Sequence, residues 1–141
     1  TLFRSGRGMS LTLNMDFQFE TTVERLWTAL TDSRQLARWI AENDFQPVVG
    51  HRFQFRHPPN EYWDGIVNCE VLAVDEPHRV SFLWVVGEER HTVTLSIQDL
   101  KNGKVNLHLE QTGMTTQQAF AGAKYGWKAW VDKLENVLLE R

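Results

Sequence analysis

The chain has 141 residues, and its 15 basic and 18 acidic side chains give a formal net charge of −3. This balance offers no electrostatic reason to bind nucleic acid or an anionic membrane. A hydrophobic content of 42% and a charged content of 23% are those of a globular protein, and the length fits one domain.

The first residues have no periodic pattern. Thr1–Gly8 precede Met9, so we expect a tag-like or flexible segment there and one domain over 9–141. The segment lacks the apolar stretch of a signal peptide, and no apolar run reaches the roughly 18 residues of a membrane helix. Cys69 is the only cysteine, which excludes an intramolecular disulfide. A cytoplasmic location fits these features.

The chain then alternates between apolar and polar residues, which predicts a half-buried strand. Its apolar positions are Leu11, Leu13, Met15, Phe17 and Phe19. Thr21 and Glu24 form a capping-box pattern that predicts a short helix over about 22–30. Asp32 can cap a second short helix, whose buried side would carry Leu36, Trp39 and Ile40.

Period-two patterning returns after these helices. Phe53 and Phe55 face opposite to Arg52 and Arg56, which predicts a strand with one wet face. The Pro58-Pro59-Asn60 step breaks the pattern because proline cannot donate to a sheet ladder. Further strands are predicted over about 62–74 and 79–86, separated by a turn that contains Pro77.

The next two strands form a hairpin whose register can be argued. A two-residue Asn102-Gly103 turn would pair Lys101 with Lys104 and set Leu95 and Ile97 against polar residues. A three-residue loop, Lys101-Asn102-Gly103, pairs Leu100 with Lys104 instead. It thereby pairs Ile97 with Leu107 and Leu95 with Leu109, and we predict this register.

The chain ends in a long amphipathic helix that we expect to begin after a Thr115 cap and to run to about Leu139. Its apolar stripe has the spacing i, i+3, i+4 and i+7. The stripe consists of Phe120, Ala123, Trp127, Trp130, Val131, Leu134, Val137 and Leu138. The predicted order is thus one strand, two short helices, about six antiparallel strands and a long helix, an α+β fold.

Several local strings, taken in order, resemble the C-terminal domain of the activator of Hsp90 ATPase (Aha1) and its bacterial relatives, in the START and Bet v 1-like helix-grip superfamily. The match runs from about Leu13 to Leu139. Its strings are Val23-Glu24-Arg25-Leu26-Trp27, Ala29-Leu30-Thr31-Asp32, Leu36-Ala37-Arg38-Trp39, Gly50-His51-Arg52-Phe53, Val71-Leu72-Ala73-Val74-Asp75-Glu76-Pro77, Thr112-Gly113 and Gly126-Trp127.

The resemblance implies a curved antiparallel sheet of six or seven strands wrapped around the C-terminal helix, often with an apolar cavity between them. Members of the superfamily bind lipids, sterols, flavonoid-like aromatics or polyketides, and a few are cyclases. Eukaryotic Hsp90 activators carry a separate N-terminal domain that makes much of the chaperone contact, and this chain has no room for one. No motif here matches the acid/base groups of the cyclase-like members.

No reactive or metal-binding constellation stands out. No pair of the five histidines has helical His-x-x-x-His spacing, and the predicted register turns His108 and Glu110 outward. Cys69 lies within a strand pattern and reads as a structural thiol. The carboxylates Asp64 and Glu70 have no spacing that demands an acid/base pair. We expect no metal and no cofactor.

The aromatic residues carry the remaining functional signal. Trp27 and Trp39 belong to the short helices, where packing is the better interpretation. A second group could fill the core or line a ligand cavity, because several large aromatics between sheet and helix can do either. The candidate lining residues are Phe53, Phe55, Trp63, Phe82, Trp84, Tyr125, Trp127 and Trp130.

The function predicted from these features is non-enzymatic binding of a small apolar or aromatic molecule that is lipid-like, flavonoid-like or polyketide-like. The alternative is a protein-interaction module or co-chaperone that acts on an Hsp90-type chaperone in stress response. A small cyclase or hydrolase is the third possibility, and it would require convergent titratable groups inside the cavity.

Overall fold

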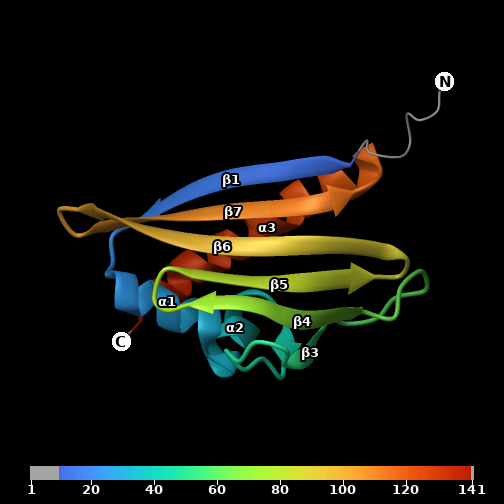
Figure 1. The fold of residues 1–141 in the computed structure, drawn as a ribbon, viewed down its shortest axis with the longest axis horizontal. Helices are drawn as coiled ribbons and strands as arrows, with labels where there is room; N and C mark the ends of the chain where they lie inside the picture. Colours follow the sequence, from blue (N-terminus) through green and yellow to red (C-terminus); the bar gives the residue numbers. More distant parts are fainter. Residues whose placement is uncertain (1–9, 141) are drawn as a thin grey trace.

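The computed structural model describes residues 10–140 and shows a curved seven-stranded antiparallel sheet with a long helix against one face (Figure 1). The expected tag-like segment and the proposed start at Met9 lie outside the described residues. The strands are β1 (Leu11–Phe19), β2 (Glu42–Asn43), β3 (Arg52–Arg56), β4 (Ile66–Asp75), β5 (Arg79–Val86), β6 (Glu89–Lys101) and β7 (Lys104–Met114). The helices are α1 (Val23–Thr31), α2 (Ser33–Trp39) and α3 (Gln117–Leu139). The predicted α+β helix-grip architecture is confirmed.

The strand order in the sheet is β1-β7-β6-β5-β4-β3-β2, so the first and last strands of the chain lie side by side. The inward faces of β6 and β7 carry the predicted apolar pairs, since Leu95 lies opposite Leu109 and Ile97 opposite Leu107. All four side chains are at most 5% exposed. The register predicted for this hairpin is therefore confirmed from Thr92 to Asp99.

The turn of that hairpin differs from the prediction. Lys101, rather than Leu100, pairs with Lys104, so only Asn102 and Gly103 lie between the strands. A β-bulge between Asp99 and Lys101 absorbs the extra residue. The bulge allows a tight turn and apolar pairing to coexist, a combination that regular pairing excludes.

The caps of two helices lie one residue later than predicted. Thr22, not Thr21, caps α1 by accepting from the backbone N–H of Arg25 at 3.0 Å. Thr116, not Thr115, caps α3 by accepting from Ala119 at 3.0 Å. The hydroxyl that caps belongs to the residue with an extended backbone directly before the helix, and adjacent threonines leave that choice open in the sequence. Asp32 caps α2 as predicted.

Helix α3 packs its apolar stripe against the sheet, and α1 and α2 close the end of the fold where α3 finishes (Figure 1). Trp127, Val131, Leu134 and Val137 are buried, with Leu134 fully inaccessible. Trp27 and Trp39 pack in the core as predicted, and the Trp39 Nε1–H donates to the carbonyl oxygen of Ala29 at 3.0 Å.

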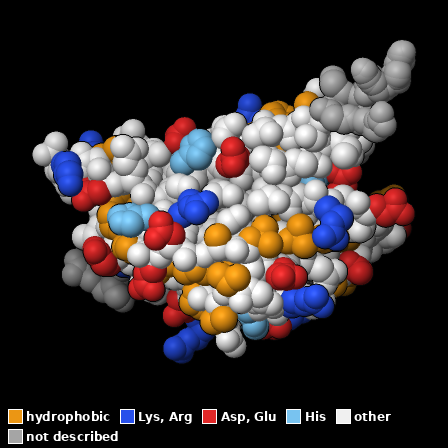
Figure 2. Space-filling view, in the orientation of Figure 1, with side chains coloured by type: hydrophobic (Ala, Val, Ile, Leu, Met, Phe, Trp, Pro, Cys, Tyr) orange, Lys and Arg blue, Asp and Glu red, His pale blue; other side chains and the backbone are white. Residues whose placement is uncertain are grey.

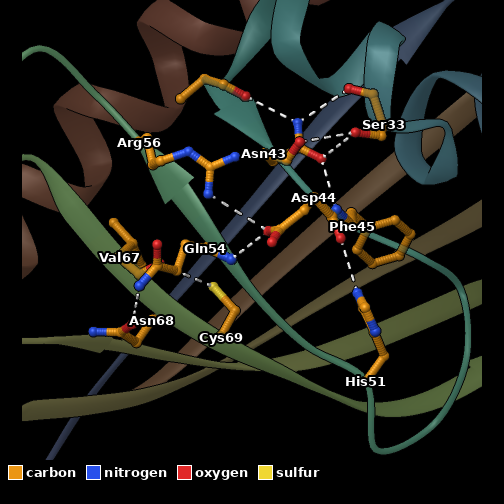
Figure 3. Close-up of polar contacts among 11 residues, drawn as sticks. Ser33, Asn43, Asp44, Phe45, His51, Gln54, Arg56, Val67, Asn68 and Cys69 are labelled. Carbon is orange, nitrogen blue, oxygen red and sulfur yellow. Dashed lines mark hydrogen bonds and ion pairs between the residues drawn. The ribbon is translucent and has the colours of Figure 1, made fainter.

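A polar network ties the short edge strand β2 to its neighbours (Figure 3). The side-chain oxygen of Asn43 accepts from Ser33 Oγ at 2.8 Å and from the Phe45 N–H at 3.0 Å. Asp44 accepts from the Gln54 N–H at 2.8 Å and pairs with Arg56 at 3.8 Å. These contacts hold the segment after α2 against β3, so that Phe45 packs edge-on to Phe53 at a centroid distance of 5.0 Å.

Candidate functional site

The described residues line a cavity of about 430 Å³, partly open to solvent, between the first half of α3 and the inward face of the sheet. Strands β4 to β7 and the loop before β4 supply its sheet-side wall. The lining residues are His57, Trp63, Val67, Trp84, Val86, His91, Gln111, Ala119, Gly122, Ala123, Gly126, Trp127 and Trp130. None of these carries a carboxylate, an ammonium or a guanidinium group.

Four tryptophans form most of the aromatic wall. Trp84 and Trp127 are 6% and 1% exposed and form the inner part, whereas Trp63 and Trp130 are half-buried. Trp127 and Trp130 lie edge to face with centroids 4.9 Å apart, and Trp84 lies 5.6 Å from Trp127. Trp84, Trp127 and Trp130 therefore form one contiguous aromatic cluster, with the ring planes tilted or edge to face.

Helix α3 leaves the space open because its cavity-facing residues are small. Ala119, Gly122, Ala123 and Gly126 recur at i, i+3, i+4 and i+7. A Cβ built on Gly122 would meet no heavy atom within 4 Å. One and a half turns further on, Val131 and Leu134 fill the equivalent space. The same helix thus lines a hollow with its first half and completes a solid core with its second.

His57 stands at the opening of the cavity. Its imidazole stacks on Trp130 at 5.6 Å and lies 5.4 Å from Trp63. Partial burial, and then the charge of Lys133, lower the pKa of His57, because both disfavour the imidazolium form. The ring is thus neutral at pH 7, with one donor and one acceptor nitrogen. Among the described residues, no side-chain hydrogen bond engages either nitrogen.

His91 and Gln111 place polar groups deep in the wall. The two residues are 6% and 2% exposed, and they meet through a 2.7 Å hydrogen bond between Gln111 Nε2 and His91 Nδ1. The other ring nitrogen of His91 contacts Glu89 Oε1 at 2.8 Å. Hydrogen bonds from Thr115 and from His91 lower the pKa of Glu89, which keeps this carboxyl ionised.

Four of the eight predicted lining residues come together around the cavity, namely Trp63, Trp84, Trp127 and Trp130. Trp63 does so from the loop before β4 and not from a strand, since β4 begins at Ile66 and not near residue 62. Phe53, Phe55 and Phe82 are at most 2% exposed and pack together in the solid core beside the cavity. Tyr125 is 80% exposed and lies outside the cavity lining.

Sequence reasoning missed His57, His91, Gln111 and the small residues of α3. The sequence did contain a signal for two of them. His91 alternates in step with the inward-facing Val93 and Leu95, and Gln111 alternates in step with the inward-facing Leu107 and Leu109. A polar residue at an inward position of an alternating strand is the informative exception. Sequence spacing gives no comparable signal for His57, which comes from the loop after β3.

The outward histidine of β7 is placed as predicted. His108 lies opposite Ser96, and Glu110 opposite Thr94, on the face turned away from α3. The two ring nitrogens of His108 contact Asp16 at 2.9 Å and Asn14 at 3.1 Å. Within residues 10–140, no group of three or more His, Cys, Asp or Glu side chains is arranged to hold a metal ion.

Cys69 lies within β4 and is 6% exposed, as predicted for a structural thiol. Burial raises its pKa far above the usual thiol value. Over residues 10–140, no helix is long and apolar enough to cross a membrane.

Many solved structures share this fold, and three of them illustrate the range of similarity. Protein MLL2253 from Mesorhizobium loti is 33% identical, with 91% of this chain and 96% of that chain covered and a TM-score of 0.82. DynU16, a putative protein in the dynemicin biosynthetic locus, is 21% identical over 90% of this chain and 46% of that chain, with a TM-score of 0.77. PFC0360w, an HSP90 activator from Plasmodium falciparum, is 18% identical over 91% of this chain and 96% of that chain, with a TM-score of 0.75. The last two likenesses establish the fold alone.

Two curated sequences also match, the glycerol kinases of Borrelia hermsii and Borrelia duttonii, at 20% and 24% identity. The match covers 68% and 62% of this chain, which spans only about a quarter of each kinase (25% and 23%). A partial match at this identity carries no kinase activity to this chain.

The sequence of residues 20–139 matches the family described as activator of Hsp90 ATPase homolog 1-like protein. This match covers most of the chain, and the observed helix-grip fold agrees with it. The chain belongs to the family of activator of Hsp90 ATPase homolog 1-like proteins.

Proposed function

We propose that this protein binds a small, flat, apolar or aromatic molecule in the cavity between α3 and the sheet. The observation that carries the proposal is the cavity-facing stripe of Ala119, Gly122, Ala123 and Gly126, which keeps about 430 Å³ open between four tryptophans. Ligand cavities of proteins measure about 300–1,000 Å³ and combine apolar walls with few polar groups. The lining described above has this composition.

The cavity also has a route for entry. Gly122 is exposed although it lines the space, and Trp63, Trp130 and His57 around it are half-buried. A ligand could therefore enter past His57 and the first turns of α3 without unfolding the sheet. Trp84 and Trp127, which are more deeply buried, would contact its inner end.

A variant that fills the hollow tests the proposal. Gly122→Leu places a side chain where a Cβ has no neighbour within 4 Å, so the helix should tolerate it while the ligand loses its space. Gly122→Ala controls for the loss of glycine, and it should raise the free energy of unfolding by about 0.5–1 kcal/mol. Ala129→Leu introduces the same side chain at an exposed position of α3 outside the lining.

The readouts are tryptophan fluorescence and melting temperature in the presence of naringenin and 2-methylnaphthalene. We expect saturable binding of at least one probe by the unmodified protein and by Ala129→Leu, and a loss of about tenfold or more in affinity for Gly122→Leu. A protein that binds none of the probes, or a Gly122→Leu variant that binds as tightly as the unmodified protein, would contradict the proposal.

A second candidate function is contact with an Hsp90-type chaperone, and the family match favours it. The sheet face turned away from α3 carries hydrophobic side chains over β4 and β5 among charged ones (Figure 2). Leu72 in this band is 42% exposed, and Leu83 and Val85 are half-buried. The test is co-purification with the Hsp90-type chaperone of the same cell and its ATPase rate. Loss of an effect in Leu72→Lys but not in Gly122→Leu would favour this function over the first.

A cyclase or hydrolase role has less support. Of the two titratable side chains in the lining, His91 has both ring nitrogens engaged. His57 alone is left to move a proton, and a cyclase-type mechanism calls for at least two convergent groups.

A further inference from the structure

A chain of hydrogen-bonded side chains leads from the cavity to the surface end of β6. Trp127 Nε1 lies 2.7 Å from Gln111 Oε1, Gln111 Nε2 lies 2.7 Å from His91 Nδ1, and His91 Nε2 lies 2.8 Å from Glu89 Oε1. Thr115 Oγ1 donates to the other oxygen of Glu89. The chain links α3, β7 and β6 across the inner end of the cavity.

The two ends of this chain set the direction of every hydrogen bond in it. An indole nitrogen can only donate, and an ionised carboxylate can only accept. Trp127 therefore donates to the amide oxygen of Gln111, whose amide nitrogen donates to His91 Nδ1. The proton of His91 then resides on Nε2 and is donated to Glu89. Turning the Gln111 amide over would face two donors at Trp127 and two acceptors at His91, so its orientation is locked.

Among the described residues, the locked amide has no partner for one N–H and one lone pair. Gln111 has four hydrogen-bonding positions, and the chain occupies two of them. Gln111 lines the cavity and is 2% exposed, so its amide has little contact with bulk solvent. A group that both donates and accepts would match them, and a neutral hydroxyl is the smallest such group.

The cavity lining offers an anionic ligand no cationic partner, since Lys133, whose charge acts on His57, is exposed and lies outside the lining. The lining contains no lysine or arginine, and His57 at the opening is neutral because its pKa is lowered. The ionised Glu89 lies directly behind His91. A carboxylate in this space would be desolvated without a partner, which is strongly unfavourable.

We propose, on the basis of the binding function above, that the cavity selects flat aromatic molecules bearing one neutral hydroxyl, such as phenols and naphthols. Gln111 recognises the hydroxyl with its unused N–H and lone pair. Trp127, His91 and Glu89 act as positioning residues that hold the amide in the orientation required. The aromatic rings of the ligand lie against the cluster of Trp84, Trp127 and Trp130, whose own centroids are 4.9–6.0 Å apart.

The test compares 2-naphthol with 2-methylnaphthalene, which has a methyl group in place of the hydroxyl, and with 2-naphthoate. Affinities are obtained by NMR titration of the tryptophan indole N–H signals. A purely apolar cavity would bind the methyl compound roughly tenfold more tightly, because burying an unpaired hydroxyl is unfavourable. We expect 2-naphthol to bind at least as tightly as the methyl compound, and 2-naphthoate to bind about tenfold or more weakly than 2-naphthol.

The matched variants are Gln111→Met, which removes the amide at similar volume, and Gln98→Met on the exposed part of β6. Gln111→Met should restore the roughly tenfold preference for the methyl compound, and Gln98→Met should leave the selectivity unchanged. A second readout needs no variant: the side-chain NH₂ signal of Gln111 in the unmodified protein should shift with 2-naphthol and stay in place with 2-methylnaphthalene.

Failure of the two proposals is distinguishable. If none of the three probes binds, the binding function itself is overturned. If the probes bind but the unmodified protein prefers 2-methylnaphthalene about tenfold, or the Gln111 NH₂ signal moves equally with both compounds, hydroxyl recognition is overturned while binding stands.

Discussion

Arg25 in α1 donates a hydrogen bond of 2.6 Å from Nη2 to the carbonyl oxygen of Val137, in the last turn of α3. Its Nη1 donates to Gln35 Oε1 in α2 at 2.7 Å. The last four carbonyls of a helix lack their usual partner within the helix; the Val137 oxygen accepts from the Glu140 N–H at 3.2 Å, and Arg25 adds a charged donor to it and joins all three helices. The Arg25 contact thereby anchors the end of α3 that lies furthest from the cavity.

Removing this guanidinium should destabilise the fold. For Arg25→Met we expect the free energy of unfolding to fall by about 1.5–3 kcal/mol, the usual range for hydrogen bonds to a charged group. Urea unfolding followed by far-UV circular dichroism measures the change. Arg34→Met, at an exposed position of α2, should change stability by less than about 0.5 kcal/mol. Equal losses in the two variants would show that the Val137 contact contributes nothing specific.

The lowered pKa of His57 leads to a prediction for its proton titration. Burial is the larger cause and the charge of Lys133 the smaller, so the NMR titration midpoint of His57 should lie below its usual value of 6.5. Lys133→Met should raise the midpoint without restoring 6.5, because burial remains. Lys128→Met, on an exposed position of α3, serves as the control. A midpoint that Lys133→Met leaves unmoved would exclude the proposed influence of the lysine.

The same shift has a consequence for stability. Between the folded pKa of His57 and the unfolded value near 6.5, the unfolded chain binds more protons than the folded one. The free energy of unfolding therefore rises as the pH increases through this window. His57→Phe should reduce that rise, which thermal unfolding at pH 5 and pH 7 can measure. An undiminished rise in the variant would assign the pH dependence to other groups.

The lowered pKa of Glu89 predicts a second pH dependence of the stability, which comes from a carboxyl group. The pKa of Glu89 is lowered in the fold, first by the hydrogen bond from Thr115 and then by that from His91. Its stabilising contribution is fully present above the unfolded pKa, near 4.3, and is lost as the pH falls through the folded pKa. Glu89→Gln should therefore lower the melting temperature at pH 7 and have a much smaller effect at pH 3.

The adjacent Glu88, which is exposed in the turn before β6, provides the matched control for this experiment. Glu88→Gln should leave the difference between pH 7 and pH 3 as it is in the unmodified protein. A Glu89→Gln effect of the same size at both pH values would mean that the side chain acts through its shape or its neutral hydrogen bonds, and not through its charge.

The fold could be predicted from the sequence where one face of an element is buried. A one-residue slip would expose every apolar residue of a strand, so Leu95 and Ile97 determine the register with Leu107 and Leu109. The bulge at Leu100 could not be predicted, because it leaves that pairing unchanged. The choice between Thr21 and Thr22, or Thr115 and Thr116, depends on backbone angles that two adjacent threonines do not distinguish.

The candidate site was predictable only in part, for a related reason. Periodicity identifies inward-facing aromatics but cannot tell a lining residue from a core residue, since that depends on the size of whatever lies opposite. Phe53 and Phe82 meet other aromatic rings, whereas Trp84 and Trp130 lie around the space that Gly122 and its small neighbours leave open. Which helix residue faces which sheet residue is known only once the helix and the sheet are packed together.

Gly65, in the loop that carries Trp63, supports the opening of the cavity. Its backbone has a φ of +85°, and a Cβ at this position would lie 2.1 Å from the carbonyl oxygen of His57. The carbonyl oxygen of Gly65 also accepts a 2.8 Å hydrogen bond from the His57 N–H. Gly65→Ala should therefore force the loop away from His57, in addition to straining its own backbone.

Gly87 separates these two effects, because its φ is +59° and a Cβ there would meet no atom within 4 Å. Gly87→Ala should lower the free energy of unfolding by about 1–2 kcal/mol from backbone strain alone. Gly65→Ala should lower it by about 3 kcal/mol or more, because the steric clash adds to the strain. It should also shift the NMR signals of the His57 ring and the Trp130 indole, which Gly87→Ala should leave in place. Equal losses of stability, with unshifted His57 signals, would show that the loop accommodates a side chain at residue 65 and that the close approach of Gly65 to His57 is not needed to shape the opening.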